Sequence, residues 1–241
     1  MASTKSSVLA GRTAVVTGAS RGIGAAVAEA LGAEGARVAL VARTRSALDE
    51  VASRIGGAVV VEADLSSTAG AVRAAGELTE KLGAVPDILV SNAGVFRIAP
   101  VHEMDVSDFE TMVATNLTAP FALMSPLIGG MRERGSGHVV TIGSVADRSV
   151  FAGNAAYSAT KFGARAIHEV LREETRGSGV RATLISPAAV DTEIWDPIQF
   201  PDGSKPNRSG MLDPTAVAEA VVFAVTRPAA VNIDELRLSR S

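Results

Sequence analysis

Three side chains within one stretch of this sequence have the types and the spacing for proton exchange with a substrate oxygen. Ser144 follows an apolar run that ends at Ile142, and Tyr157 and Lys161 follow on a helix-length stretch. Residues four apart share one face of a helix, so the Lys161 ammonium can lie beneath the Tyr157 phenol. A nearby cation favours the phenolate, which a tyrosine needs in order to exchange protons near neutral pH. Ser144, from a neighbouring element, could hold a substrate oxygen against the same phenol.

Composition limits the classes of protein to which this chain can belong. Of its 241 residues, 47% are apolar and 20% are charged, which indicates a globular protein with a substantial core. A net charge of −3 with one Trp, one Tyr and seven Phe gives no case for a nucleic-acid partner. The absence of cysteine excludes disulfides and thiolate chemistry, and the three histidines lie too far apart to predict a metal site.

The amino-terminal residues 1–7 are polar and lack the apolar core of a secretory signal. No run of consecutive apolar residues is long enough to offer a membrane span. We therefore expect a cytoplasmic protein with no membrane partner.

Short apolar runs alternate with helix-length stretches along the whole chain. The runs are Arg12–Thr17, Arg37–Ala42, Val59–Val61, Ile88–Val90, Val139–Ile142, Arg181–Ile185 and Ile233–Leu238. The helical stretches are Ile23–Ala33, Ser46–Ile55, Thr68–Leu82, Val106–Met131, Ala155–Arg176 and Pro214–Thr226. Runs without strict alternation indicate strands buried on both faces, and strand–helix alternation implies right-handed crossovers. Because no linker or repeat divides the chain, we predict one doubly wound α/β domain over residues 1–241, with a seven-stranded parallel sheet.

Three glycines lie at the junction between the first predicted strand and the first helix. Gly18, Gly22 and Gly24 form the pattern G-x-x-x-G-x-G. Glycine permits positive φ and close approach of the backbone, and a helix N-terminus presents free N–H groups to a phosphate. An ordinary tight turn is the alternative, but the position at the first strand–helix junction favours a dinucleotide pyrophosphate site.

The residues after the second strand bear on the choice of cofactor. A carboxylate there would hold a ribose 2′-hydroxyl, whereas an arginine accommodates a 2′-phosphate. Here Arg43, Thr44 and Arg45 end the strand without an acid before Asp49, and Arg21 can point to the same place. NADP(H) is therefore favoured over NAD(H), because guanidinium groups bind phosphate as charged forks. Arg45 could equally be a solvated surface arginine.

Polar residues also follow the third and fourth strands. Asp64 could accept a hydrogen bond from an adenine amino group, or it could cap the next helix, a role that Ser66 or Ser67 would serve as well. The tripeptide Asn92-Ala93-Gly94 lies at the carboxyl edge of the sheet, where ligands gather. Its backbone could run beside an adenosine, or it could be a turn without a ligand.

Asn116 falls inside the predicted helix Val106–Met131. Asparagine is unfavourable in a helix interior because its side chain competes for backbone groups. It indicates either a local distortion that holds a water near Lys161 or simply an exposed polar face.

Together these motifs resemble the short-chain dehydrogenase/reductase family in its compact form. The matching motifs, in family order, are Thr17-Gly18-x-x-x-Gly22-x-Gly24, Asp64, Asn92-Ala93-Gly94, Asn116, Ser144, Tyr157-x-x-x-Lys161 and Pro187. The resemblance implies a Rossmann-type fold and an NADP(H)-dependent oxidoreductase that interconverts a ketone or aldehyde and an alcohol by hydride transfer. The carboxyl end resembles a subgroup that acts on 3-hydroxy acids, and also β-ketoacyl-carrier-protein reductases.

The resemblance implies a catalytic tetrad of Asn116, Ser144, Tyr157 and Lys161. Tyr157 would protonate the carbonyl oxygen while the nicotinamide C4 delivers hydride, or would do the reverse in oxidation. Ser144 would orient and polarise that oxygen. Lys161 would bind the nicotinamide ribose hydroxyls and favour the phenolate, and Asn116 would anchor a water that connects Lys161 to solvent.

The resemblance also implies a set of cofactor contacts along the carboxyl edge of the sheet. They are Gly18, Ser20, Arg21, Gly22, Ile23, Gly24, Arg43, Thr44, Asp64, Leu65, Asn92, Ala93, Gly94, Tyr157, Lys161, Pro187, Val190 and Thr192. Thr192 stands where the family's threonine meets the nicotinamide amide. Pro187-Ala188 departs from the usual Pro-Gly. If that backbone needs positive φ, we expect the alanine to add strain of about 1 kcal/mol.

Substrate contacts are expected from Ser144, Tyr157, Phe96 and Trp195. The segment 188–212 has the length and composition of a lid. Trp195 on it could cover an apolar substrate or could pin the segment to the core. Arg97 and Arg148 could meet a substrate carboxylate or could be solvated surface residues.

The sequence also bears on two alternative functions and on oligomeric assembly. A non-catalytic dinucleotide-binding or redox-sensing module of the same fold would be marked by loss of Tyr157 or Lys161, and both are present. An enoyl reductase of related fold would place its lysine farther after the tyrosine. The resemblance further implies a homotetramer, or a homodimer, built on the helices Val106–Met131 and Ala155–Arg176.

Overall fold

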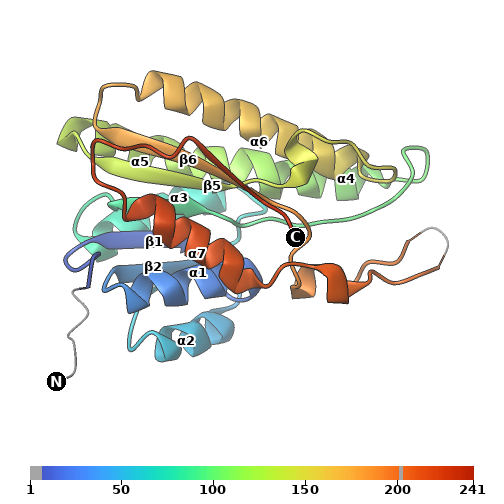
Figure 1. The fold of residues 1–241 in the computed structure, drawn as a ribbon, viewed down its shortest axis with the longest axis horizontal. Helices are drawn as coiled ribbons and strands as arrows, with labels where there is room; N and C mark the ends of the chain where they lie inside the picture. The colour runs from blue at the N-terminus through green and yellow to red at the C-terminus, as the bar shows by residue number, and fades with distance from the viewer. Residues whose placement is uncertain (1–6, 201–202) are drawn as a thin grey trace.

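The computed structural model describes residues 7–200 and 203–241, and it places seven parallel strands in one sheet (Figure 1). The strands are β1 Thr13–Thr17, β2 Arg37–Ala42, β3 Val59–Glu62, β4 Ile88–Ser91, β5 Gly137–Ile142, β6 Val180–Pro187 and β7 Glu235–Leu238. Their spatial order is β3-β2-β1-β4-β5-β6-β7. The order reverses between β1 and β4, and this switch point is where open α/β sheets bind ligands. The predicted doubly wound parallel sheet is confirmed.

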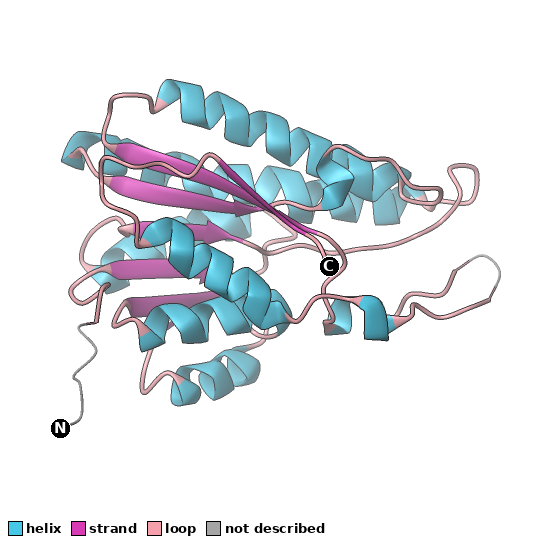
Figure 2. Ribbon diagram, viewed as in Figure 1, coloured by secondary structure: helices cyan, strands magenta, loops and turns pink. Residues whose placement is uncertain are grey.

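Helices cover both faces of the sheet (Figure 2). One face carries α1 Gly22–Ala33, α2 Arg45–Arg54 and α7 Pro214–Val225, and the other carries α3 Thr68–Leu82, α4 Val106–Val113, α5 Ala119–Arg134 and α6 Ala155–Glu174. Each face has its own apolar core. In β1, Ala14 and Val16 pack into the first core and Val15 packs into the second. This alternation explains why a strand buried on both faces reads as a continuous apolar run.

The helix ends follow local capping chemistry. The Ser67 hydroxyl accepts the N–H of Gly70 at the start of α3, so Ser67 and not Asp64 caps this helix. The Asp213 carboxylate accepts the N–H of Thr215 at the start of α7. Such side chains satisfy N–H groups that have no partner within the helix.

The predicted single helix Val106–Met131 is interrupted in the structure. Between α4 and α5 lies a five-residue π-helical segment, η1 Ala114–Thr118, which contains Asn116. By length and composition alone the whole segment 106–134 could cross a membrane. However, Leu123, Leu127 and Met131 are buried in the core beneath the sheet, so it is a core helix of this fold.

Two histidines are buried beside the sheet. His138 Nε2 lies 2.8 Å from the Thr183 hydroxyl, and His168 Nδ1 lies 2.9 Å from the Thr141 hydroxyl. Burial, reinforced by the charge of Arg181, lowers the pKa of His138 to about 3. Burial also lowers the pKa of His168 to about 4.

We expect the free energy of unfolding to fall as the pH drops below the ordinary histidine pKa near 6.5. Both histidines stay neutral in the folded chain but take up protons once unfolded, so protons favour the unfolded state in this window. Between pH 7 and pH 5 the loss should be roughly 2 kcal/mol for each histidine. Urea unfolding at several pH values measures it. Replacing the exposed His102 should leave the pH dependence unchanged, whereas His138→Gln should flatten it.

Candidate functional site

One cavity of about 790 Å³ extends along the carboxyl edge of the sheet, from the end of β2 to the end of β6. Most of the predicted site residues line it. They are Gly18, Ser20, Arg21, Gly22, Ile23, Arg43, Thr44, Leu65, Asn92, Ala93, Gly94, Phe96, Ser144, Tyr157, Lys161, Pro187, Val190, Thr192 and Trp195. Gly24, Asp64 and Asn116 do not line the cavity, and each has another role in the structure.

The glycine loop folds tightly against the start of α1. Gly18 and Gly22 have φ values of 65° and 54°, in the left-handed region that favours glycine. A Cβ at Gly24 would lie 2.1 Å from the carbonyl oxygen of Gly18, so Gly24 permits the close packing of helix and loop. Arg21, the residue before α1, makes no side-chain capping bond within the described part of the chain, so the first N–H groups of the helix can face an anion in the cavity.

Asn92 braces this loop, a role that the sequence did not reveal. Its side-chain amide donates to the carbonyl oxygen of Thr17 at 2.9 Å, while the Thr17 hydroxyl accepts the N–H groups of Asn92 and Ala93 at 3.0 Å. The turn after β4 and the loop after β1 are therefore one hydrogen-bonded unit. The only indication of this role in the sequence is a polar residue at position 92 within a loop of small residues.

At the other end of the cavity, Arg21 and Arg43 provide a cationic edge beside the end of β2, where Thr44 also lines the cavity. Arg45 lies outside the cavity, where its Nε donates to Asp49 at 3.0 Å on the exposed face of α2, so it is a surface arginine. The Asp64 carboxylate accepts the N–H and the hydroxyl of Ser66, both at 2.9 Å. These bonds from Ser66 lower the pKa of Asp64 and keep it ionised.

The interpretation of Asn116 as an exposed polar residue is wrong, because the side chain is buried and fully engaged. Its Oδ1 accepts the N–H of Val95 at 2.8 Å, and its Nδ2 donates to the carbonyl of Val95 at 2.9 Å. Nδ2 also donates to the Thr160 hydroxyl at 3.2 Å. Asn116 thus joins the helix distortion, the loop after β4 and helix α6, and the local distortion considered as the alternative is present.

Ser144, Tyr157 and Lys161 all line the cavity. Lys161 Nζ donates to the carbonyl oxygen of Ile142 at 3.1 Å and lies 5.6 Å from the centre of the Tyr157 ring. The two side chains come from successive turns of α6, as their spacing predicts. The Ser144 hydroxyl accepts the N–H of Ala146 at 3.1 Å at the end of β5.

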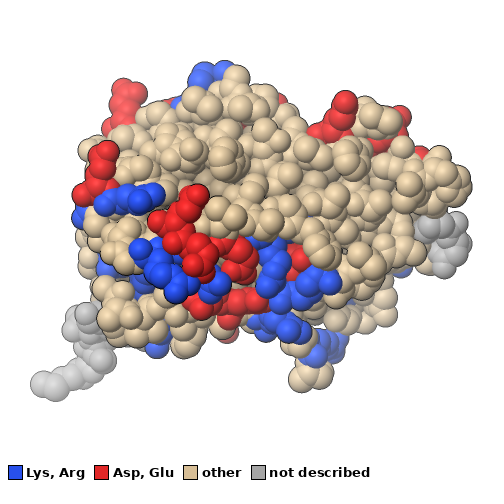
Figure 3. Space-filling model, turned by 90° about the horizontal axis from the view of Figure 1, so that it is seen from above, with Lys and Arg blue, Asp and Glu red and all other residues tan. Residues whose placement is uncertain are grey.

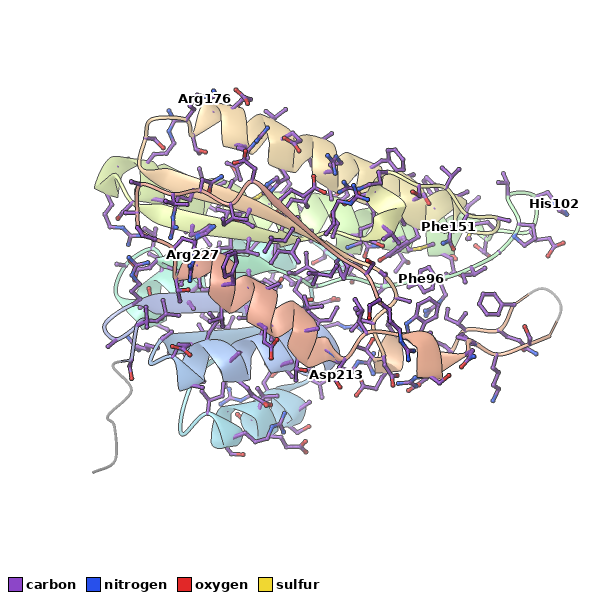
Figure 4. All side chains as sticks on the ribbon, viewed as in Figure 1. Phe96, His102, Phe151, Arg176, Asp213 and Arg227 are labelled. Atoms are coloured by element: carbon purple, nitrogen blue, oxygen red, sulfur yellow. The ribbon has the colours of Figure 1, made fainter. Side chains whose placement is uncertain are left out.

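An aromatic wall stands beside Tyr157. The ring of Phe96 makes edge-to-face contacts with Tyr157 at 4.6 Å and with Trp195 at 5.2 Å between ring centres. Figure 4 shows Phe96 and Phe151 at the end of the molecule where the strands terminate. Trp195 Nε1 donates to the carbonyl oxygen of Val190 at 3.0 Å. Trp195 therefore both fixes its own segment and lines the cavity.

The predicted lid at 188–212 consists of extended chain and two short 3₁₀ turns, η3 Glu193–Trp195 and η4 Arg208–Gly210. Residues 201 and 202 of this segment lie outside the described part of the chain. Its start crosses the glycine loop, because a Cβ at Gly22 would lie 3.0 Å from Thr192 Cγ2. No non-glycine residue within 7–200 and 203–241 has positive φ, so the strain anticipated at Ala188 is absent.

Neither arginine considered for a substrate carboxylate lines the cavity. Arg97 donates to the carbonyl oxygen of Phe96 at 2.8 Å and lies 4.0 Å from the Asp108 carboxylate. Arg148 is held by Asp147 at 2.7 Å and by Glu235, so it is not a substrate contact, and ion pairs hold its partly exposed side chain.

Arg148 belongs to an ion cluster behind the Ser144 turn, which the sequence analysis missed. The fully buried Asp147 carboxylate accepts the Ser186 hydroxyl at 2.5 Å and lies 3.6 Å from Arg165 of α6. Arg165 in turn lies 3.4 Å from Glu235 of β7. Figure 3 shows basic and acidic side chains gathered side by side on the face seen from above. The cluster ties the turn after Ser144 to β6, β7 and α6.

Comparisons with known proteins agree with this arrangement. A family model described as short chain dehydrogenase matches residues 12–201. The glycine betaine reductase ATRR of Emericella nidulans is 39% identical over 239 residues, which are 95% of this chain but only 18% of the fungal protein. An uncharacterized oxidoreductase of Staphylococcus saprophyticus is 35% identical over 230 residues, covering 93% of this chain and 95% of that protein.

Solved structures share the fold over nearly the whole chain. A metagenomic short-chain oxidoreductase in complex with NADP superimposes with a TM-score of 0.84 at 33% identity, covering 97% of this chain and 99% of that chain. Serine dehydrogenase from Escherichia coli superimposes with a TM-score of 0.81 at 30% identity, covering 94% of this chain and 96% of that chain.

Proposed function

Because this chain belongs to the short-chain dehydrogenase/reductase family of NAD(P)-dependent oxidoreductases, we propose that it interconverts a ketone or aldehyde and the corresponding alcohol, with Tyr157 as the general acid and base. One observation carries the proposal: Ser144, Tyr157 and Lys161 line the same cavity as the glycine loop and the start of α1. A cavity that joins proton-transfer groups to an anion site suits a dinucleotide and a small substrate together.

The residues present fit a dinucleotide. The free N–H groups of α1 and the glycine loop would hold its pyrophosphate, and Asn92 keeps that loop in place. When bound, the nicotinamide supplies or accepts the hydride. The protein's part is to position the two reactants and to move a proton.

In the reduction, the Tyr157 hydroxyl would donate its proton to the substrate oxygen while the Ser144 hydroxyl donates a hydrogen bond to the same atom. Lys161, fixed by the carbonyl oxygen of Ile142, would hold the ribose hydroxyls and stabilise the phenolate that forms. Asn116 would position α6 through Thr160, and a water beside it would return a proton to Lys161. The oxidation of an alcohol would use the same groups in reverse.

Steady-state oxidation of NADPH against a panel of ketones, β-keto esters and 3-keto acids tests the proposal. We expect turnover on part of the panel, and its loss in Tyr157→Phe. Tight NADPH binding without turnover on any neutral or acidic carbonyl compound would favour the alternative, a dinucleotide-binding or redox-sensing module.

We further propose that NADP(H) is preferred over NAD(H). Arg21 and Arg43 line the end of the cavity beside β2, and the segment between β2 and α2 contributes no carboxylate to the cavity lining described. A related short-chain oxidoreductase of known structure is in complex with NADP, which supports the choice.

Arg43→Asp should weaken NADPH binding by at least about 10-fold while NADH binding stays the same or improves, because a carboxylate repels the 2′-phosphate and accepts a 2′-hydroxyl. Fluorescence titration of each cofactor measures the two dissociation constants. Arg45→Asp is the matched control, since Arg45 lies outside the cavity. Equal effects of Arg43→Asp on both cofactors would contradict the assignment.

We also propose that residues 1–241 form one domain, because both apolar cores are built on the two faces of a single sheet. Assembly into a homotetramer would use α4, α5 and α6, where the described side chains of Phe109, Phe121 and Phe162 are exposed.

A further inference from the structure

The part of the cavity around Tyr157 has a strongly apolar wall. Its apolar side chains include Phe96, Ile98, Val145, Phe151, Ile194 and Trp195. Phe96 is 5% exposed and packs against both Tyr157 and Trp195. Such a wall stabilises an apolar substituent by removing it from water and stabilises nothing that carries a charge.

The charged side chains that line the cavity lie away from the apolar wall or contact other groups. Among the described residues its charged side chains are Arg21, Arg43, Lys161 and Glu193. Arg43 follows β2, which β1 and β4 separate from the strand that leads to Ser144, and Arg21 belongs to the glycine loop. Lys161 is held beneath Tyr157, and the Glu193 carboxylate lies 3.5 Å from the position of a Cβ on Gly22. No free cation therefore faces the apolar wall in this part of the chain.

Among the described residues that line the cavity, Thr115 and Asn154 each have a buried side-chain oxygen without a hydrogen-bond partner, and Asn154 is the one that lies beside Tyr157 in the chain. Asn154 lines the cavity, and its Oδ1 is buried without a hydrogen bond to any described residue. Asn154 precedes the first turn of α6 but makes no capping bond with its side chain. It lies three residues before Tyr157, so both side chains lie near the same face at the start of α6. A buried amide oxygen without a partner is costly, and because it is an acceptor only a ligand group that donates a hydrogen bond, such as a hydroxyl, could complete the bond.

We propose that this site takes uncharged carbonyl compounds with a bulky apolar substituent on the side of Phe96 and Trp195, and with a neutral hydroxyl that donates a hydrogen bond to Asn154 Oδ1. This inference rests on the proposed function and names its substrate class. Carboxylates are excluded, because the site would bury their charge against an apolar wall without a cation. Asn154 is the specificity-determining residue.

A series of phenyl ketones that differ only in the group next to the carbonyl tests the proposal. The groups are methyl in acetophenone, hydroxymethyl in 2-hydroxyacetophenone, an ethyl ester in ethyl benzoylformate and a carboxylate in benzoylformate. We expect kcat/KM for the hydroxyl and ester compounds to exceed that for the carboxylate by at least about 100-fold. Comparable use of benzoylformate would overturn the proposal, as would a preference for the cationic trimethylammonium acetaldehyde.

The variant Asn154→Leu tests the contribution of the Asn154 side-chain amide to substrate specificity. We expect it to lower kcat/KM for the hydroxyketone by about 10-fold and to leave acetophenone and the ester nearly unchanged. Ser149→Ala is the matched control, because Ser149 is exposed on the same loop and does not line the cavity. If Asn154→Leu and the unaltered chain gave the same ratios of kcat/KM among these substrates, Asn154 would not be the specificity-determining residue.

Binding without turnover separates this inference from the proposed function. Trp195 is the only tryptophan of the chain and lies in the aromatic wall, so its fluorescence reports occupancy. With NADP⁺ present, ethyl benzoylformate should bind at least about 10-fold more tightly than benzoylformate. If no compound is turned over but the ester still binds more tightly than the carboxylate, the proposed reaction is wrong and the proposed ligand class is supported. Equal binding of the two compounds would overturn the ligand class whatever the turnover.

Discussion

Tyr157→Phe should lower kcat by about 10²–10⁴-fold while the dissociation constant for NADPH changes little, because the substitution removes the group that donates the proton and nothing else. The phenylalanine ring keeps the edge-to-face contact with Phe96 at 4.6 Å, so the aromatic wall is preserved. Since the chain contains no other tyrosine, no second phenol can replace it. NADPH absorbance measures turnover, and cofactor fluorescence measures binding.

Arg176→Ala serves as the control, because Arg176 is exposed beyond the far end of α6 and pairs only with Glu173 among the described residues. It should keep the activity of the unaltered chain. A Tyr157→Phe protein that retained more than about a tenth of kcat would exclude general acid catalysis by this residue.

Asp147→Ala should reduce the free energy of unfolding by about 1–3 kcal/mol, because it removes the fully buried carboxylate that accepts the Ser186 hydroxyl and pairs with Arg148 and Arg165, while both arginines keep Glu235. For a chain of this length the midpoint of thermal unfolding should fall by about 2–10 °C. The Ser144 turn loses its anchor to Ser186 at the same time, so kcat should fall as well. Calorimetry and urea unfolding measure the stability.

Asp49→Ala provides the comparison for this effect. Asp49 pairs with Arg45 one turn away on α2, and both side chains are more than half exposed. Exposed pairs of this kind contribute only about 0.3–0.5 kcal/mol. If the two alanine variants proved equally stable, the buried cluster would not anchor the turn.

Those features that depend on local patterns could be predicted from the sequence. Glycine spacing placed the loop before α1, and the spacing of Tyr157 and Lys161 placed both on one face of α6. Apolar runs located the strands, because the central strands are buried on both faces and need apolar residues at nearly every position, whereas the edge strand β7 is only partly buried. These properties belong to residues close together in the chain.

Features that depend on distant partners could not be predicted. Asn116 was a poor helix residue whose partners, Val95 and Thr160, lie 21 and 44 positions away in the chain. Asp147 reads as an ordinary loop acid, and only the fold brings Arg165, Ser186 and Glu235 around it. Arg148 was considered for a substrate carboxylate because nothing in its neighbours along the chain revealed the buried cluster.

The short turn η3 and the residue before it touch both halves of the cavity. Thr192 and Glu193 lie over Gly22 of the glycine loop, while Trp195, two residues later, lies in the aromatic wall. Any displacement of this turn therefore changes the access of the dinucleotide and the shape of the substrate wall together. A dinucleotide that ordered η3 would therefore raise the affinity for a carbonyl compound, and the converse would hold by the same factor.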